Sequence, residues 1–290
     1  MQTINIDSSG AEKKTSTGIS MGLTYFLGLL MYMLVFIFGA QVMRGVIEEK
    51  TSRVVEVIIS SVRPVQLMMG KIIGIALVGL TQFLIWIILT ASIIVVLKTT
   101  FLPDAGMNEI SKNIPQNIMA QNNMNAAVQV TQVSPGSAEI TALIDSAINQ
   151  PWGLIIFSFI FYFITGYLLY ASIFAAIGSA VDNETETQQF MLPVTIPIIL
   201  ALMVAMGTMQ NPESPLSFWC SMIPLTSPIV MMARIPFGVP VWQLAASMII
   251  MLISFGAFVW MAAKVYRTGI LMYGKKASWK EMWKWLTFNG

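Results

Sequence analysis

The residue types that usually carry catalysis and metal binding are scarce in this sequence. It contains no histidine and a single cysteine, Cys220, which excludes an internal disulfide and a Cys/His zinc cluster. The segment Gly269–Lys276 matches a phosphate-binding P-loop at every position except the last. Lys276 stands where Ser or Thr must coordinate magnesium, and the segment continues a predicted membrane helix instead of following a strand. We therefore expect no ATP site, cofactor or metal in this chain.

Ionisable residues are absent from the apolar stretches that are long enough to cross a membrane. An Asp, Glu, Lys or Arg inside a span is the usual marker of an ion path. Only neutral polar side chains remain there, and Thr81 with Gln82 is the best candidate pair for lining a path. Hydrogen bonding between helices explains Gln82 equally well. These residues do not assemble a sodium site. A lipid-like molecule or a peptide is therefore as well supported as sodium as the substrate.

The loop Asp182-Asn-Glu184-Thr-Glu186 carries three carboxylates at alternate positions. They suit a bound cation or the basic residues of a partner protein. A solvated connector that caps the following helix is the plainer interpretation, and the one that we favour.

The segment 44–71 connects two apolar stretches and is rich in charge. Its part from Thr51 to Ile59 has the spacing of a short amphipathic helix, with Arg53 and Glu56 on the polar side. The apolar side carries four branched side chains, namely Val54, Val55, Ile58 and Ile59. Such a helix either anchors at the membrane surface or docks to a cytoplasmic subunit, and its residues alone do not decide between these roles.

Composition predicts the elements that position these residues. The chain has 290 residues, of which 56% are apolar and 10% are charged, and its mean hydropathy is +0.73. Soluble domains carry about 25% charged residues to cover their surface, so we expect an all-α, polytopic membrane protein. Each span needs about 20 apolar residues. Five uncharged stretches meet this need, at about 19–43, 72–97, 152–177, 190–209 and 241–263.

The uncharged segment at 211–238 differs because it contains Pro215, Pro224 and Pro228. Proline lacks an N–H and disfavours helix in the preceding residue. Irregular backbone at membrane depth needs protein or a water-filled cavity around it. We interpret 211–238 as an external re-entrant pair of short helices, with a sixth, kinked span as the alternative.

The distribution of basic residues indicates the orientation. Segment 44–71 holds five Lys and Arg residues, and the tail 264–290 holds six. With five spans the two segments lie on the same side, which the positive-inside rule makes cytoplasmic. The loop 98–150 and the N-terminal stub 1–18 are then external. We expect a multi-pass protein of a prokaryotic inner membrane with a cytoplasmic C-terminus.

Four stretches of the sequence resemble ABC-2-type permeases, in the order of that family, and the nearest branch includes the sodium-efflux permeases. They are Glu48–Gly74, Asp182–Gln189, Ser214–Pro228 and Tyr266–Lys275. The resemblance implies a coupling helix at about 48–62 that presses into a groove on a nucleotide-binding subunit. It implies that role for five residues, namely Glu48, Glu49, Thr51, Arg53 and Glu56.

The resemblance implies that 19–290 is the transmembrane domain of an ATP-binding-cassette exporter permease, with ATP and magnesium on a separate ATPase subunit. The chain is then expected to pair with itself or with a sister permease in the lipid membrane, and to bind no nucleic acid. Sodium, a drug or a lipid-like molecule is the implied substrate, and a non-transporting scaffold or assembly subunit is the alternative function. Members of that branch usually begin with another span and a sizeable external domain. Residues 1–18 are therefore either a remnant of such a domain or the start of a short subunit completed by another chain.

Overall fold

The computed structural model describes most of the chain, namely residues 5–6, 12–13, 17–59, 61–101, 150–182, 184–272 and 279–287. The chain divides into two compact units. One comprises Met1–Gly79 with Leu143–Gly290, and the other comprises Leu80–Ala142. Most of the loop predicted at 98–150 lies outside the described residues.

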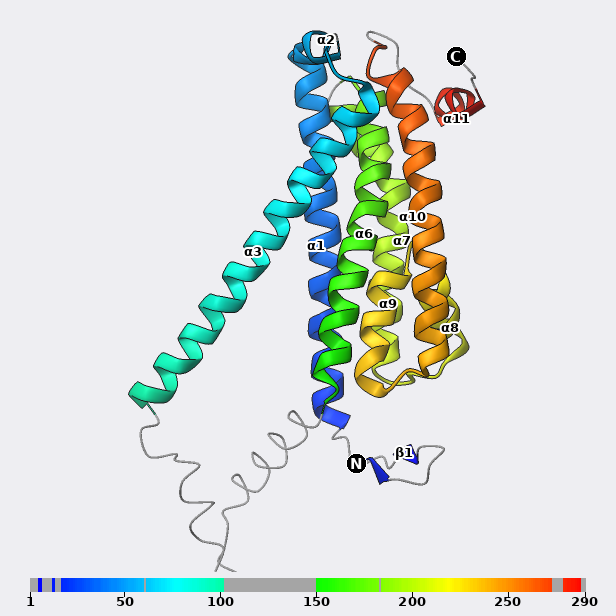
Figure 1. Cartoon of the computed structure of the whole chain (residues 1–290). Helices are drawn as coiled ribbons and strands as arrows, with labels where there is room; N and C mark the ends of the chain where they lie inside the picture. Colours follow the sequence, from blue (N-terminus) through cyan, green and yellow to red (C-terminus); the bar gives the residue numbers. More distant parts are fainter. Residues whose placement is uncertain are drawn as a thin grey trace, which may run out of the picture. The chain divides into compact units, whose positions relative to one another are not determined.

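Long α-helices dominate the described chain (Figure 1). They are α1 (Thr17–Thr51), α2 (Val54–Ile59), α3 (Pro64–Phe101), α6 (Trp152–Ala180), α7 (Glu184–Thr208), α8 (Pro215–Met222), α9 (Ser227–Arg234), the 3-10 helix η2 (Ile235–Phe237), α10 (Val241–Gly269) and α11 (Trp279–Thr287). Five of them, α1, α3, α6, α7 and α10, are long and apolar enough to cross a membrane, which confirms the predicted number of spans. Within the predicted stub 1–18, two short strands, β1 (Asn5–Ile6) and β2 (Glu12–Lys13), pair antiparallel.

The helices extend beyond the predicted spans because those predictions stopped at charged residues. α1 continues through Glu48 and Glu49 to Thr51, and α3 begins at Pro64, before the charged Lys71. Proline suits a first helical turn, where its missing N–H has no intrahelical partner to lose. α10 likewise extends to Gly269, so the predicted tail 264–290 begins as helix.

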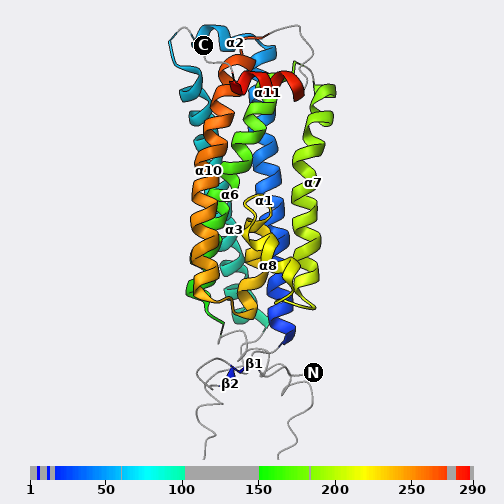
Figure 2. The ribbon, with the colours of Figure 1, turned by 90° about the vertical axis from the view of Figure 1, so that its right-hand side faces the viewer.

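Helix α6 packs between α1 and α10 and also contacts α7 and α9 (Figures 1 and 2). Glycine allows the closest approach, since a Cβ on Gly178 would lie 2.8 Å from the carbonyl oxygen of Met43 in α1. Three buried tyrosine hydroxyls of α6 donate hydrogen bonds to three different elements. Their acceptors are Ser247 Oγ for Tyr162 (2.9 Å), the Ile72 carbonyl for Tyr167 (2.8 Å) and the Leu225 carbonyl for Tyr170. α6 thereby aligns α10, the start of α3 and the turn before α9.

The segment predicted as re-entrant forms α8, α9 and η2 at one end of the first unit, between α7 and α10 (Figure 1). Every residue of α9 is buried, and α9 packs against α1, α6 and α7. Pro215 and Pro228 lie in the first turns of α8 and α9. Gly238, with φ of 88°, turns the chain towards α10. The segment thus forms the predicted pair of short helices, each of 8 residues and too short to cross a membrane; its external position stays a prediction.

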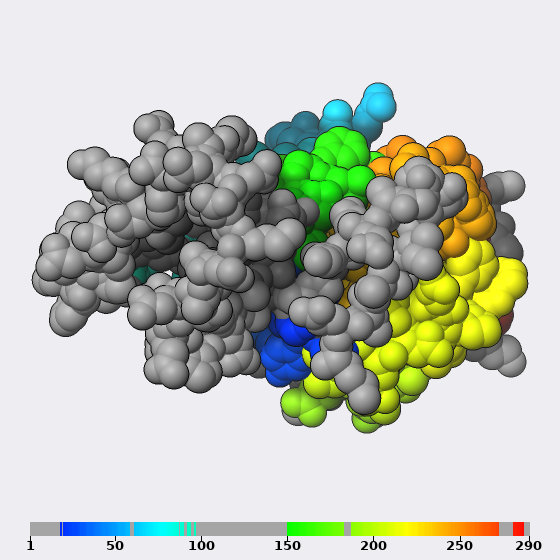
Figure 3. Space-filling model, turned by 90° about the horizontal axis from the view of Figure 1, so that it is seen from below, coloured from blue at the N-terminus to red at the C-terminus, as the bar shows by residue number. Residues whose placement is uncertain are grey.

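The first unit has two distinct ends. The α8 end carries α8, α9 and η2, and it is seen face-on in Figure 3, where this segment (yellow) forms surface beside the ends of α6 (green) and α10 (orange). The α2 end is the opposite one and carries α2 and α11 (Figure 1).

Candidate functional site

Helix α2 follows a sharp turn at the end of α1. The Thr51 hydroxyl donates to the carbonyls of Ile47 (3.0 Å) and Glu48 (3.1 Å), which satisfies groups of the last turn of α1. Arg53 then adopts a left-handed conformation, with φ of 57°. This conformation is unfavourable for a residue with a Cβ, and it separates α2 from α1. The predicted helix at about 48–62 is therefore shorter than expected, because Glu48 and Thr51 belong to α1.

Helix α2 buries one apolar side chain against the protein and exposes two others. Val55 is fully buried, whereas Val54 is 47% exposed and Val57 is 73% exposed. The acidic Glu56 is exposed beside them. Two apolar side chains of this six-residue helix, Val54 and Val57, therefore remain at the surface of the α2 end.

The five residues implied in coupling fall into two groups. Glu48, Thr51, Arg53 and Glu56 are exposed on the last turn of α1, the turn and α2. Glu49 is half-buried and points inward, where its carboxylate lies 2.7 Å from Lys71 Nζ of α3. Lys71 also donates to the Gly45 carbonyl of α1 (2.5 Å). Glu49 therefore holds α1 against the start of α3.

A second ion pair joins α1 to the loop after α6. Lys50 is 1% exposed, and its Nζ lies 2.8 Å from the Asp182 carboxylate. The same nitrogen donates to the Ser179 carbonyl at 2.6 Å. Burying the charge of Lys50 is costly, and the carboxylate and carbonyl offset that cost only while both stay in place. The pair therefore fixes the position of α1 relative to the end of α6.

The ion pairs Glu49–Lys71 and Lys50–Asp182 form a charged cluster at the α2 end. Helix α10 lies beside this cluster. Tyr266 is fully buried, and its hydroxyl makes no hydrogen bond to any described residue. A Cβ on Gly269 would lie 2.8 Å from Ser179 Oγ, beside the carbonyl that binds Lys50. Gly269, the first position of the P-loop-like segment, therefore allows α10 to pack closely against α6. Residues 273–276 of that segment lie outside the described residues.

Sequence reasoning missed the lysine partners of this cluster. The prediction used Lys50 and Lys71 only as positive charges that indicate the orientation of the spans in the membrane. The sequence predicts Asp182 in a solvated connector. In the structure Asp182 instead forms an ion pair with the buried Lys50. A lysine next to the last residue of a long apolar helix is the signal that was available. The side chains of Glu184 and Glu186 are not described, and among the described residues no cluster of three metal-ligating side chains occurs.

The predicted path-lining pair lies in the other unit. Thr81 and Gln82 are neighbours on α3, and both are exposed. Their path-lining role stays a prediction.

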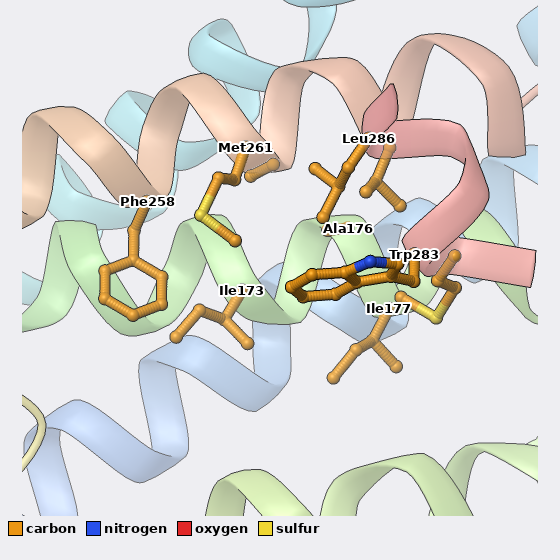
Figure 4. A pocket seen from close by; sticks show the side chains of 10 residues that line it. Ile173, Ala176, Ile177, Phe258, Met261, Trp283 and Leu286 are labelled. Atoms are coloured by element: carbon orange, nitrogen blue, oxygen red, sulfur yellow. The ribbon is translucent and has the colours of Figure 1, made fainter. Parts of the chain in front are cut away.

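An apolar pocket of about 270 Å³ lies between α6, α10 and the tail helix α11 (Figure 4). Trp283 and Leu286 of α11 face Ile177 of α6 and Met261 of α10 across it. Lys264 of α10 donates to the Leu286 carbonyl at 3.2 Å, which ties α11 to the bundle. Helix α11 therefore packs on the spans through its apolar side chains.

The sequence was compared with known proteins. The sequence model of a protein family described as "ABC-2 family transporter protein" matches residues 1–264. The uncharacterized protein YhaP of Bacillus subtilis (strain 168) is 28% identical over 272 residues, which is 93% of this chain and 56% of YhaP. The uncharacterized protein MJ1024 of Methanocaldococcus jannaschii is 32% identical over 95 residues, which is 33% of this chain and 23% of that protein. No solved structure matches the chain. The sodium-efflux branch stays a prediction.

Proposed function

The chain belongs to the ABC-2 transporter family, and from this premise we propose that it is the permease subunit of an ATP-binding-cassette exporter driven by a separate ATPase. Two copies, or one copy with a sister permease, form the membrane path in this proposal. The α2 end faces the cytoplasm, because the basic segments 44–71 and 264–290 both approach that end of the unit (Figure 1).

The observation that carries the proposal is the surface of α2. Val54 and Val57 are largely exposed, and the charged Arg53 and Glu56 stand beside them. Exposed apolar side chains within a charged rim are the usual composition of a protein interface. We assign this surface to a groove on the ATPase.

The ion pairs supply the connection from α2 to the spans. Only residues 52–53 separate α2 from α1, and only residues 60–63 separate it from α3. Glu49 with Lys71 holds those two spans together, and Lys50 with Asp182 extends the connection to α6. A displacement of α2 by the closing ATPase therefore moves the ends of three spans as a unit.

The test is the double variant Arg53→Ala, Glu56→Ala in the full chain co-purified with its ATPase. Truncating an interface centre often costs more than 1 kcal/mol, so we expect about tenfold weaker ATPase binding. ATP-dependent export from vesicles should fall with it. The variant should keep its thermal stability, because both side chains are exposed.

Arg267→Ala is the matched control, since Arg267 is exposed but lies on α10. It should leave binding and export unchanged. If the double variant binds the ATPase and exports like the wild type, α2 is a membrane-surface anchor and the coupling role is wrong.

A further inference from the structure

The α8 end holds a buried arginine, Arg234, at the last position of α9. It is only 5% exposed and is the single charged residue of α9, at the helix C-terminus that favours a cation. α9 is enclosed by α1, α6 and α7, so the arginine side chain extends inside the protein towards α8 and the start of α10. A buried charge at this place calls for a partner of opposite sign.

Every hydrogen-bond acceptor that the described residues offer to Arg234 is neutral. Its Nε donates to the Pro212 carbonyl (3.3 Å), Nη1 to Ser221 Oγ (2.7 Å) and Nη2 to Gln243 Oε1 (2.9 Å). The Phe218 ring adds a cation–π contact at 6.0 Å. A guanidinium has five N–H donors, so two remain for another acceptor.

No carboxylate among the described residues lies within ion-pair distance of Arg234. Glu213 acts on it only at longer range and is exposed at the surface. Burial lowers the pKa of Arg234, and Glu213 raises it. Arginine nevertheless stays protonated in proteins. The site therefore contains a permanent, fixed positive charge that no carboxylate of the described chain contacts.

A cavity of about 850 Å³ opens at this arginine. Arg234 and Gln243 supply its polar groups near α9 and α10. Gln210, Asn211 and Glu213 also line the cavity, and its apolar wall carries the aromatic rings of Phe218, Trp219 and Phe237. This volume lies in the range of small-molecule sites, which are mostly apolar with a few fixed polar groups.

We propose that this cavity binds an amphipathic anion, with its carboxylate or phosphate on Arg234 and its apolar part along Phe218, Trp219 and Phe237. The three neutral acceptors hold the guanidinium in one orientation, so that its free N–H groups are ready for the anion before it arrives. Glu213 stands at the rim and weakens the attraction of the cavity for negative charge. The site is a property of the permease chain and does not depend on coupling to an ATPase.

The test uses the purified full chain in nanodiscs of phosphatidylcholine, with quenching of Trp219 fluorescence by ω-bromooctanoate. The neutral ω-bromooctanol is the matched probe, and Trp219→Phe identifies the reporting residue among the eight tryptophans. We expect saturable quenching by the carboxylate at a concentration about tenfold or more below that for the alcohol, because hydrogen bonds to charged groups are the strong ones. Arg234→Gln should remove this preference, and Glu213→Gln should tighten carboxylate binding a few-fold.

Equal binding of the carboxylate and the alcohol by the wild type would overturn the proposal, as would a folded Arg234→Gln variant that keeps the preference. If Arg234→Gln does not fold, the proposal is tested by the carboxylate and alcohol comparison in the wild type and by the effect of Glu213→Gln on carboxylate binding. Nanodiscs that also contain phosphatidylglycerol distinguish the source of the anion. Competition by that lipid assigns the site to a lipid headgroup, and absence of competition assigns it to a soluble anion. Failure of all probe binding would leave the proposed coupling through α2 intact, because no ATPase is present in this assay.

Discussion

Replacing Asp182 by alanine tests whether the buried ion pair at the α2 end holds the spans together. The substitution takes the carboxylate away from Lys50, which is 1% exposed, and leaves the Ser179 carbonyl as an acceptor at 2.6 Å. Removing one partner of a buried pair costs about 3–5 kcal/mol. Because Asp182 itself is 24% exposed and water reaches this end, we expect about 3 kcal/mol of destabilisation, at the low end of that range.

The reverse substitution should cost less. Lys50→Met keeps the length of the side chain and leaves only the partly solvated Asp182 without its lysine, so we expect about 1–2 kcal/mol. The double variant Lys50→Met, Asp182→Ala removes both charges and should be no less stable than Lys50→Met alone. The cycle then gives a coupling energy of about 3 kcal/mol, at the upper end of the range for residues in direct contact.

Unfolding by SDS in mixed micelles, followed by tryptophan fluorescence, measures these differences. The Glu49–Lys71 pair provides the comparison, because its side chains are 27% and 13% exposed. More solvated pairs contribute less, so a Glu49→Ala, Lys71→Met cycle should give a coupling energy of about 1 kcal/mol or below. A coupling energy for Lys50 and Asp182 below about 0.5 kcal/mol, the level at which independent sites add, would refute the reasoning.

Two further predictions concern packing in the first unit. Gly178→Ala places a Cβ 2.8 Å from a main-chain oxygen of α1, and since backbone cannot yield as a side chain can, unfolding in SDS should become easier by about 1–3 kcal/mol. Gly207→Ala, with open space around it, is the control and should be neutral or slightly stabilising. Tyr162→Phe loses the hydrogen bond to Ser247 and should cost about 1 kcal/mol in the same assay. Tyr25→Phe, at an exposed tyrosine, should cost nothing measurable, and an equal loss in both variants would contradict this assignment.

The spans and the re-entrant segment were predictable because their signals are local. An uncharged stretch of about 20 residues has few alternatives to a membrane helix, since its backbone groups must bond to one another. Pro215 and Pro228 likewise marked where short helices begin, and both lie in first turns of helices. Helix ends were less predictable. α1 runs on to Thr51 because the charges of Glu49 and Lys50 find partners on α3 and in the loop after α6, and no local pattern reports those partners.

The sequence by itself determined that this protein is an all-helical membrane protein of the ABC-2 type, with five spans and a proline-broken segment that does not cross. These properties follow from hydropathy, proline positions and short motifs, which act within one element. Only the tertiary structure decided which charges pair. It joined Lys50 to Asp182, which lie far apart in the sequence, turned Glu49 inward, left Val57 at the surface, and buried Arg234 beside a cavity. A charged side chain contacts solvent, a partner protein or a neighbouring helix according to what surrounds it in space. Helices that are distant in the sequence supply those surroundings.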